Sequence, residues 1–215
     1  MTSKSLAEYQ PTIKTARLTL DPPSPKDDPA MRDMFSDIPT MAYLRFKTKE
    51  EKGGWTMPEV VDRREGQSKL IEQRAGSTFY IHDQATGELA GVMGANSINR
   101  VDRNAHVGII LWKKYWSGGY GTEALYELMR GLFEDDKLHK ITYETTEKND
   151  GMRGFLEKAC GIPLTYINKD ELMCTATNKW VSFYVYVIFE DDWPHIKAAL
   201  LEKMRVGAAK YSSKS

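Results

Sequence analysis

A glycine-rich stretch, Ser117-Gly118-Gly119-Tyr120-Gly121-Thr122, holds the residues best suited to bind a charged ligand. A strand-like run precedes it and an amphipathic helical run follows at once, which predicts a strand, a tight turn and a helix N-terminus. Glycine lets the backbone approach a ligand without hindrance from a Cβ atom. The first turn of a helix also offers unpaired N–H groups at the positive end of the helix dipole. The stretch therefore indicates a site for a phosphate or pyrophosphate group.

Three cationic side chains are candidates to meet further phosphate charge: Lys113 and Lys114, just before this stretch, and Arg153, further along the chain. A tight turn with no ligand would use the same glycines, so both interpretations remain open on the residues alone. The stretch is not a Walker loop, because no Gly-Lys-Ser/Thr follows it, and it lacks the Gly-x-Gly-x-x-Gly spacing of a dinucleotide fingerprint.

Hydrophobic periodicity predicts the elements that position the glycine-rich stretch. Strands are expected at 15–20, 78–82, 88–98, 105–112, 140–146 and 181–189, with a hairpin turn at 83–87. Helices are expected at 26–46, 56–74, 120–133, 151–159 and 196–204. A run of three strands followed by helical crossovers predicts a mixed α/β domain.

Length and composition fit one globular domain. The chain has 215 residues, of which 41% are hydrophobic and 28% charged. We expect a flexible N-terminal segment at 1–10, a single domain at 11–205 and a loose C-terminal tail at 206–215.

Charge and cysteine content exclude several classes of function. The 30 basic and 30 acidic residues balance, so the basic surplus of a nucleic-acid-binding protein is absent. Two cysteines, Cys160 and Cys174, are too few for a disulfide framework and favour a reduced, cytoplasmic compartment. The chain contains no run of eighteen apolar residues, so no membrane span is predicted. The first ten residues lack the apolar core of a signal peptide.

Four motifs, in order, resemble those of the GNAT acetyltransferases. The family's acetyl-CoA loop has the pattern Arg/Gln-x-x-Gly-x-Gly/Ala, and the stretch here is similar to the form found in enzymes that acetylate the N-termini of ribosomal proteins. In that branch Trp replaces the leading Arg/Gln, as Trp116 does here. The motifs that carry the resemblance are Thr15–Leu20, Thr86–Gly91, Tyr115–Ala124, and Asn149 with Phe155–Lys158 and Gly161.

The resemblance implies a fold and a cofactor. The fold is a mixed, largely antiparallel sheet of about six or seven strands, with helices on both faces and a parallel splay between 107–112 and 141–146. The cofactor is acetyl-CoA, used as a co-substrate, with no metal. The residues implied to contact it are Ile109, Ile110, Leu111 and Trp112 along the pantetheine and thioester, Trp116, Ser117, Gly118, Gly119, Tyr120, Gly121 and Thr122 around the pyrophosphate, and Asn149, Met152 and Arg153 across the splay.

The catalytic residues depart from the family pattern at two positions. His106 stands where many members have a glutamate base; histidine titrates near 6.5, so it could take a proton from the amine, or it could be a sheet residue with one hydrogen bond. Leu156 stands where many members have a tyrosine that protonates the thiolate. Tyr143 and Tyr184 are possible substitutes, together with Tyr186, although aromatic residues on strands more often pack in a core.

These features predict an N-acetyltransferase that moves an acetyl group to a primary amine by direct transfer. The acceptor is open among a protein N-terminus, a small amine, and an amino acid or sugar amine. The alternatives are a catalytically silent acyl-CoA-binding module of the same fold and a binding protein for another phosphorylated ligand. Neither nucleic acid nor membrane is expected as a partner, and the protein is expected to be a monomer or homodimer.

Overall fold

The computed structural model describes residues 6–212, with side chains described to residue 206. The fold is built around one mixed sheet. The sheet has eight strands in the order β1-β2-β3-β4-β5-β6-β8-β7. Neighbouring strands are antiparallel except β5 and β6, which run parallel. The strands are β1 (Ile13–Lys14), β2 (Leu18–Asp21), β3 (Ser77–Asp83), β4 (Leu89–Asn99), β5 (Asn104–Leu111), β6 (Lys140–Thr146), β7 (Tyr166–Cys174) and β8 (Lys179–Phe189).

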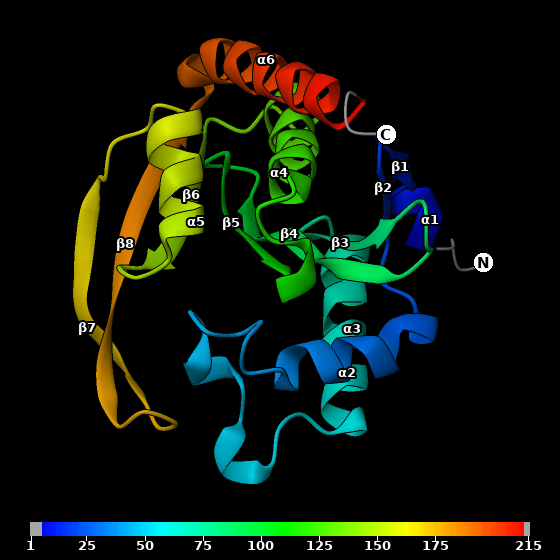
Figure 1. The fold of residues 1–215 in the computed structure, drawn as a ribbon, viewed down its shortest axis with the longest axis vertical. Helices are drawn as coiled ribbons and strands as arrows, with labels where there is room; N and C mark the ends of the chain where they lie inside the picture. Colours follow the sequence, from blue (N-terminus) through cyan, green and yellow to red (C-terminus); the bar gives the residue numbers. More distant parts are fainter. Residues whose placement is uncertain (1–5, 213–215) are drawn as a thin grey trace.

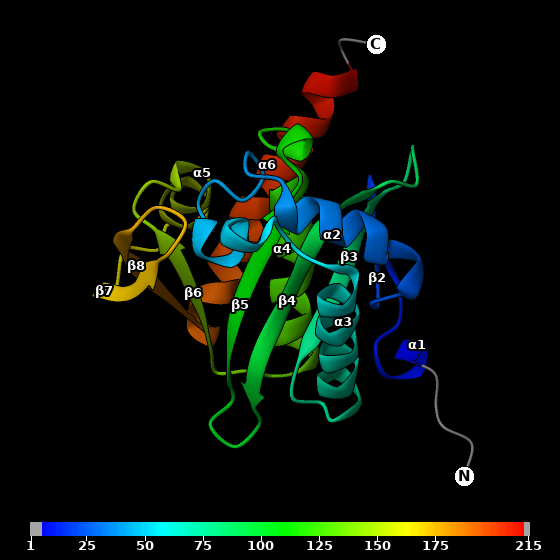
Figure 2. The ribbon, with the colours of Figure 1, turned by 90° about the horizontal axis from the view of Figure 1, so that it is seen from below.

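Helices cover both faces of this sheet (Figure 1). They are α1 (Leu6–Tyr9), α2 (Asp28–Ser36), α3 (Met57–Glu72), α4 (Tyr120–Arg130), α5 (Asp150–Gly154) and α6 (Trp193–Ser212). Helices α2 and α3 lie on one face, and α4 and α6 lie on the other (Figures 1 and 2). Two π-helical turns, Gly131–Asp135 and Phe155–Ala159, extend α4 and α5.

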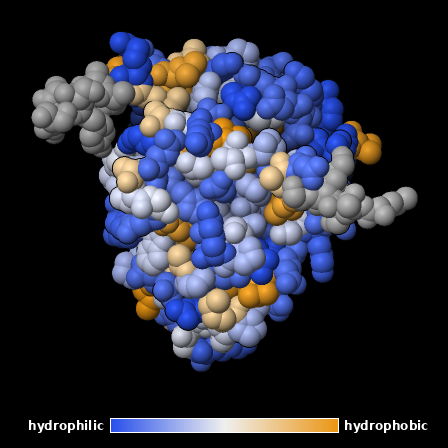
Figure 3. Space-filling view, turned by 90° about the vertical axis from the view of Figure 1, so that its right-hand side faces the viewer, coloured by the Kyte–Doolittle hydropathy of each residue, from blue (hydrophilic) through white to orange (hydrophobic). Residues whose placement is uncertain are grey.

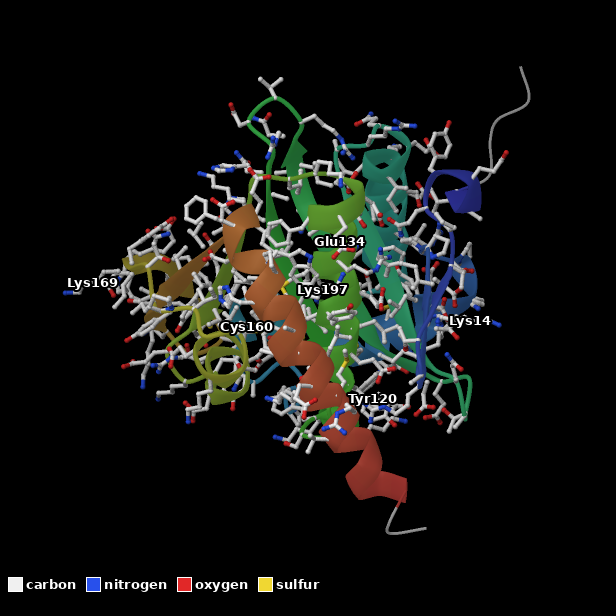
Figure 4. All side chains as sticks on the ribbon, turned by 90° about the horizontal axis from the view of Figure 1, so that it is seen from above. Lys14, Tyr120, Glu134, Cys160, Lys169 and Lys197 are labelled. Atoms are coloured by element: carbon white, nitrogen blue, oxygen red, sulfur yellow. The ribbon has the colours of Figure 1, made fainter. Side chains whose placement is uncertain are left out.

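The alternation of side chains along a strand divides the core into two clusters. On β3, Phe79 and Ile81 pack in the cluster under α4 and α6, whereas Tyr80 packs in the cluster under α2 and α3. The π-helical turn that extends α4 forms an ion pair with α6, in which Lys197 Nζ lies 2.7 Å from Glu134 Oε1 (Figure 4). Tyr120 lies at the opposite end of α4 (Figure 4).

The helix expected at 26–46 was predicted too long. Its α-helical part, α2, ends at Ser36, and Asp37 is extended with φ −77° and ψ 107°. Pro39 disfavours the helical conformation of the residue before it, and Asp37 Oδ2 accepts a hydrogen bond from the Thr40 backbone N–H at 2.9 Å. The chain therefore turns here, and the segment 37–56 crosses toward β7 and β8 (Figure 1).

Helix is present toward both ends of the chain. Within the segment 1–10, expected to be flexible, residues 6–9 form α1, and the buried Gln10 side chain bonds the backbone of Thr78; residues 1–5 lie outside the described part. Helix α6 starts at Trp193 and continues to Ser212, past the end expected at 204 and into the tail expected to be loose.

The strand predictions were mostly correct in place but incomplete in number. Of the strand expected at 15–20, only 18–20 belong to a strand, β2, because the Thr15 N–H donates to the Leu18 carbonyl at 2.9 Å and closes a tight turn between β1 and β2. Strand β7 was missed, so the sheet has eight strands where six or seven were expected. The hairpin turn at 83–87 is confirmed, with Gly87 at φ 71°.

The surface toward the β1 end of the sheet is mostly hydrophilic, with apolar residues in small separate groups (Figure 3). Within residues 6–212, no helix has the length and apolar character needed to span a membrane.

Candidate active site

The parallel strands β5 and β6 separate in the middle of the sheet. They pair from Asn104–Lys140 to Val107–Tyr143 and no further. Beyond that point β5 continues with β4 to Leu111, and β6 continues with β8 to Thr146. The separation confirms the expected parallel splay and leaves two strand edges facing an opening.

Backbone polar groups of β5 point into this opening. The Trp112 N–H donates to the Ala90 carbonyl of β4 at 2.9 Å. Because backbone groups alternate in direction along a strand, the N–H and carbonyl groups of Ile110 and Gly108 also point toward β4. Those of Ile109 and Leu111 point the other way, toward β6. The Leu111 carbonyl accepts a hydrogen bond from Trp116 Nε1 at 2.8 Å. The N–H and carbonyl of Ile109 point into the opening, where a ligand could bind them.

The glycine-rich turn sits at the same end of β5. Ser117 and Gly119 both adopt the left-handed region, with φ of 62° and 79°, and Gly119 is the N-cap of α4. No side chain caps this helix, so its first-turn N–H groups are open to a ligand. A Cβ atom on Gly121 would lie 3.4 Å from Leu111 Cδ1, between the turn and β5. These features fit an anionic group such as a pyrophosphate.

Arg17 and Glu123 hold the turn in place, which the sequence did not reveal. Glu123, only 6% exposed, accepts hydrogen bonds from the Arg17 backbone N–H and from Arg17 Nε, both at 2.8 Å. Arg17 Nη1 donates to the Gly118 carbonyl at 2.8 Å, and its guanidinium carbon lies 4.4 Å from the Tyr120 ring centroid. The hairpin formed by β1 and β2 is thus bonded to Gly118 in the turn and to Glu123 in the first turn of α4.

The three cations expected near a phosphate differ in their surroundings. Lys114 forms an ion pair with Glu88. Arg153 Nε lies 3.2 Å from Glu157 Oε1. Lys113 Nζ lies 4.3 Å from the Trp116 ring centroid and has no carboxylate partner within residues 6–206. Lys113 is therefore the one of the three that keeps its charge available beside the turn.

The segment after α2 also contacts the turn, through residues that the sequence did not single out. Tyr43 stacks on Trp116 with ring centroids 5.7 Å apart and an angle of 15° between the planes. Thr40 Oγ1 accepts a hydrogen bond from the Lys113 N–H at 3.0 Å. Trp116 is therefore held between the β5 backbone and Tyr43.

Asn149 and Met152 lie across the splay, at the end of β6. Asn149 Oδ1 accepts from the Met152 N–H at 3.2 Å and caps α5, while Asn149 Nδ2 donates to Thr145 Oγ1 at 2.9 Å. Met152 is partly buried against the cluster under α4 and α6. In this structure both residues order the junction between β6 and α5.

His106 projects from β5 on the face of the sheet that carries α2 and α3. Alternation fixes this direction, because Val107 packs under α4 and α6 whereas Ile110 packs with the α2–α3 cluster. The His106 side chain is 57% exposed, and its Nδ1 lies 4.0 Å from Oε1 of Glu144 on β6. A Cβ atom on Gly108 would meet no atom within 4 Å, so the surface beyond His106 is open.

The two tyrosines proposed as proton donors occupy different environments. Tyr143 is 1% exposed in the core, its hydroxyl has no hydrogen-bond partner within the described residues, and burial raises its pKa. The catalytic role expected for Tyr143 stays a prediction, and the burial of its hydroxyl argues against it. Tyr184 is partly buried, its ring 5.0 Å from the Arg153 guanidinium, and burial with Glu147 raises its pKa. Leu156, whose side chain has no group that can donate a proton, is fully buried.

A hollow of about 570 Å³ lies beside His106 on the α2–α3 face. It includes Asn96 of β4, which is the cross-strand partner of His106 on β5. The hollow is lined by Lys49, Trp55, Glu59, Asp62, Arg63, Gly66, Gln67, Leu70 and Asn96. The hollow therefore lies near the start of β5, whereas the glycine-rich turn follows the end of the same strand.

Comparisons with known proteins agree with this arrangement. The family model described as "Acetyltransferase (GNAT) domain" matches residues 17–160. An uncharacterized N-acetyltransferase, p20, from Bacillus licheniformis is 23% identical over 138 residues, which cover 64% of this chain and 75% of p20.

Solved structures share the fold. The RimL ribosomal L7/L12 alpha-N-protein acetyltransferase in complex with coenzyme A superposes with a TM-score of 0.72 at 16% identity, covering 84% of this chain and 99% of that one. The spermidine N-acetyltransferase from Vibrio cholerae, in complex with CoA and spermine, gives a TM-score of 0.69 at 18% identity, covering 83% and 98%.

The fold and the site define an acyl-transferring class of protein built around a splayed parallel strand pair. The chain belongs to the GNAT acetyltransferase family, whose domain model covers more than half of it. It is an N-acetyltransferase.

Proposed function

We propose that this protein uses acetyl-CoA to acetylate a primary amine by direct transfer within the opening between β5 and β6. The observation that carries the proposal is the juxtaposition of an uncapped helix N-terminus, the exposed β5 edge at Ile109, and His106 beside an open hollow. The relatives whose names state an acceptor act on a ribosomal-protein N-terminus and on spermidine, and both acceptors are amines.

The residues at the turn fit the cofactor. The N–H groups of Tyr120, Gly121 and Thr122 would hold the pyrophosphate, with Lys113 supplying charge at the rim. The Ile109 backbone would bind the pantetheine arm along the opening. When bound, acetyl-CoA supplies a thioester whose carbonyl carbon is the acetyl donor.

His106 is the candidate base. It would take a proton from the attacking amine as the new N–C bond forms and the C–S bond breaks. Glu144, 4.0 Å from His106 Nδ1, would orient the ring and stabilise its positive charge once protonated. The departing thiolate also needs a proton. Tyr184 remains the proposed donor among the tyrosines, with solvent at the opening as the other source.

We further propose a cytoplasmic location, because both cysteines are free and buried rather than joined. The acceptor would be a small molecule or a protein N-terminus, and the protein a monomer or homodimer.

A silent acyl-CoA-binding module is the second candidate, favoured by the buried Leu156 and Tyr143, neither of which can donate a proton to the thiolate. Incubation with acetyl-CoA and a panel of primary amines, read as release of free thiol, separates the two. Amine-dependent thiol release supports the enzyme. Saturable binding of acetyl-CoA with no release for any amine supports the module.

A further inference from the structure

Gly108 is a glycine in the middle of β5 that the fold itself does not require. Its φ lies outside the left-handed region that favours glycine. A Cβ atom at this position would meet no atom of the described residues within 4 Å. Glycine inside a strand weakens it, because the unfolded chain gains freedom and the folded strand gains no side-chain packing. Close approach of a ligand to the backbone is the remaining physical reason for a glycine here.

Two glycines of the neighbouring strand β4 are, by contrast, required by the sheet. Gly94 is the cross-strand partner of Gly108, and a Cβ atom on Gly94 would collide with the Ser77 carbonyl oxygen of β3. A Cβ atom on Gly91 would collide in the same way with the Ile110 carbonyl oxygen of β5. Gly94 and Gly91 therefore allow neighbouring strands to approach each other, whereas Gly108 faces open space.

Gly94 and Gly108 together leave a strip of the sheet without side chains. Alternation places both on the face that carries α2 and α3. Toward the end of β5, the next cross-strand pair on this face, Val92 and Ile110, packs in the α2–α3 cluster. Toward its start, His106 is exposed. Directly opposed side-chain positions lie about 5 Å apart, so the strip, called the glycine floor below, is two empty side-chain positions wide.

The glycine floor lies between the groups assigned to the two reactants. His106 precedes Gly108 by two residues on the same face, a separation of about 7 Å along the strand. The backbone groups of Ile109, next to Gly108, point into the opening between β5 and β6. With the amine at His106 and the thioester at Ile109, the carbon that carries the amine lies over Gly108. A side chain at position 108 would occupy that space.

We propose that the glycine floor receives the amine-bearing carbon of the acceptor, and that this carbon is branched, as in an amino-acid amide. An unbranched carbon carries only hydrogens beside the amine and the chain, and so needs less room than two empty side-chain positions provide. The second substituent of a branched carbon would lie on the backbone of Gly108 and Gly94. This inference rests on the proposed function and specifies its substrate. Gly108 acts as a specificity-determining residue and takes no part in the proton transfer.

The test uses pairs of amines that differ in branching at the amine-bearing carbon: glycinamide with alaninamide, and n-butylamine with sec-butylamine. Spermidine is a further unbranched amine, and the readout is release of free thiol at saturating acetyl-CoA. The parent protein should use the branched member of a pair at least as well as the unbranched one. Gly108→Ala should lower kcat/KM for the branched amine by roughly 10-fold or more, and for the unbranched amine by less than about threefold.

Gly66→Ala is the matched control. Gly66 lies on α3 and lines the hollow beside His106, and a Cβ atom on it would also meet no atom within 4 Å among the described residues. This variant should change kcat/KM for neither kind of amine. Because Gly108 has open space and no left-handed φ, Gly108→Ala should fold, with a melting temperature no lower than that of the parent and an unchanged response to acetyl-CoA.

Equal losses for both members of a pair in Gly108→Ala, or no loss for either, would overturn the inference while leaving the acetyltransferase itself intact. Preference of the parent protein for the unbranched amines, or a branched-amine loss confined to Gly66→Ala, would overturn it as well. Absence of thiol release with every amine, while acetyl-CoA still raises the melting temperature, would contradict the proposed function and the inference together.

Discussion

Arg17 and Glu123, 106 residues apart in the chain, are joined by two hydrogen bonds of 2.8 Å that fasten the first hairpin to the first turn of α4. Arg17 bonds the Gly118 carbonyl with the same guanidinium. The position of the glycine-rich turn therefore depends on a contact between the β1–β2 hairpin and α4, and not on the glycines alone.

Breaking this contact should weaken both the fold and the binding of the cofactor. Glu123→Gln keeps the side chain's shape but removes the charge, which leaves Arg17 without its carboxylate. We expect a loss of about 1–3 kcal/mol in the free energy of unfolding by urea and a higher KM for acetyl-CoA. Asp33→Asn, at the exposed Arg32–Asp33 pair of 2.6 Å, is the control and should cost under about 1 kcal/mol. Equal effects of the two variants would show that the contact at the turn has no special weight.

The glycine at 121 should be required for cofactor affinity. In Gly121→Val the Cβ would lie 3.4 Å from Leu111 Cδ1, and the two methyl groups beyond it would enter the space between the turn and β5. KM for acetyl-CoA should rise by roughly tenfold or more, equivalent to about 1.4 kcal/mol of binding. Gly131→Ala, at the other end of α4, should leave KM unchanged. Unaltered acetyl-CoA kinetics in Gly121→Val would remove the turn from the site.

His106 should govern the chemical step. His106→Ala should lower kcat by roughly 10²- to 10⁴-fold at neutral pH, because proton removal from the amine would depend on water alone. The loss should shrink as the pH rises and free amine becomes abundant. Glu144→Gln should lower kcat less, while leaving KM for acetyl-CoA unchanged. A full rate in His106→Ala would exclude the residue as the base.

Cys160 should make stability fall at alkaline pH. Burial at 2% exposure raises the pKa of this thiol to about 12, above its ordinary value near 9. Between these values the unfolded thiol loses its proton while the folded one keeps it, so the unfolded state binds fewer protons and stability declines as the pH rises above 9. Urea unfolding at pH 8 and pH 10 should show a smaller difference for Cys160→Ala than for the parent protein. Parallel declines in both proteins would mean that Cys160 is not the source.

The predictable elements were those whose side chains face a core. The hydrophobic patterns of β3, β4, β5 and α4 predicted these elements, and the resemblance to the family motifs predicted the splay. Strand β7 carries mostly exposed residues, including Tyr166, and lies at the sheet edge, where one side of the strand has no neighbour and no alternation is required. The helix ending at Ser36 was overextended because apolar residues continue past the turn that Pro39 imposes.

The residues of the candidate site also fall into a group that local sequence could predict and a group that it could not. The glycine turn and His106 could be chosen from local sequence, because glycine and histidine have distinctive chemistry. Tyr43, Arg17 and Glu144 could not, because each gains its role from a contact with a distant part of the chain, such as the stacking of Tyr43 on Trp116. The burial of the Tyr143 hydroxyl could not be predicted for the same reason, because only the packing shows it.

Every role proposed above depends on the binding of acetyl-CoA by the splay and the glycine-rich turn. Thermal unfolding with acetyl-CoA, CoA, ATP and NAD, each titrated separately, measures this binding. Acetyl-CoA at a hundred times its Kd should add about 2.7 kcal/mol of stability, a rise in Tm of roughly 5–10 °C, with a comparable response to CoA and none to NAD. No response to acetyl-CoA or CoA, or a response to ATP or NAD instead, would contradict the assignment of this site.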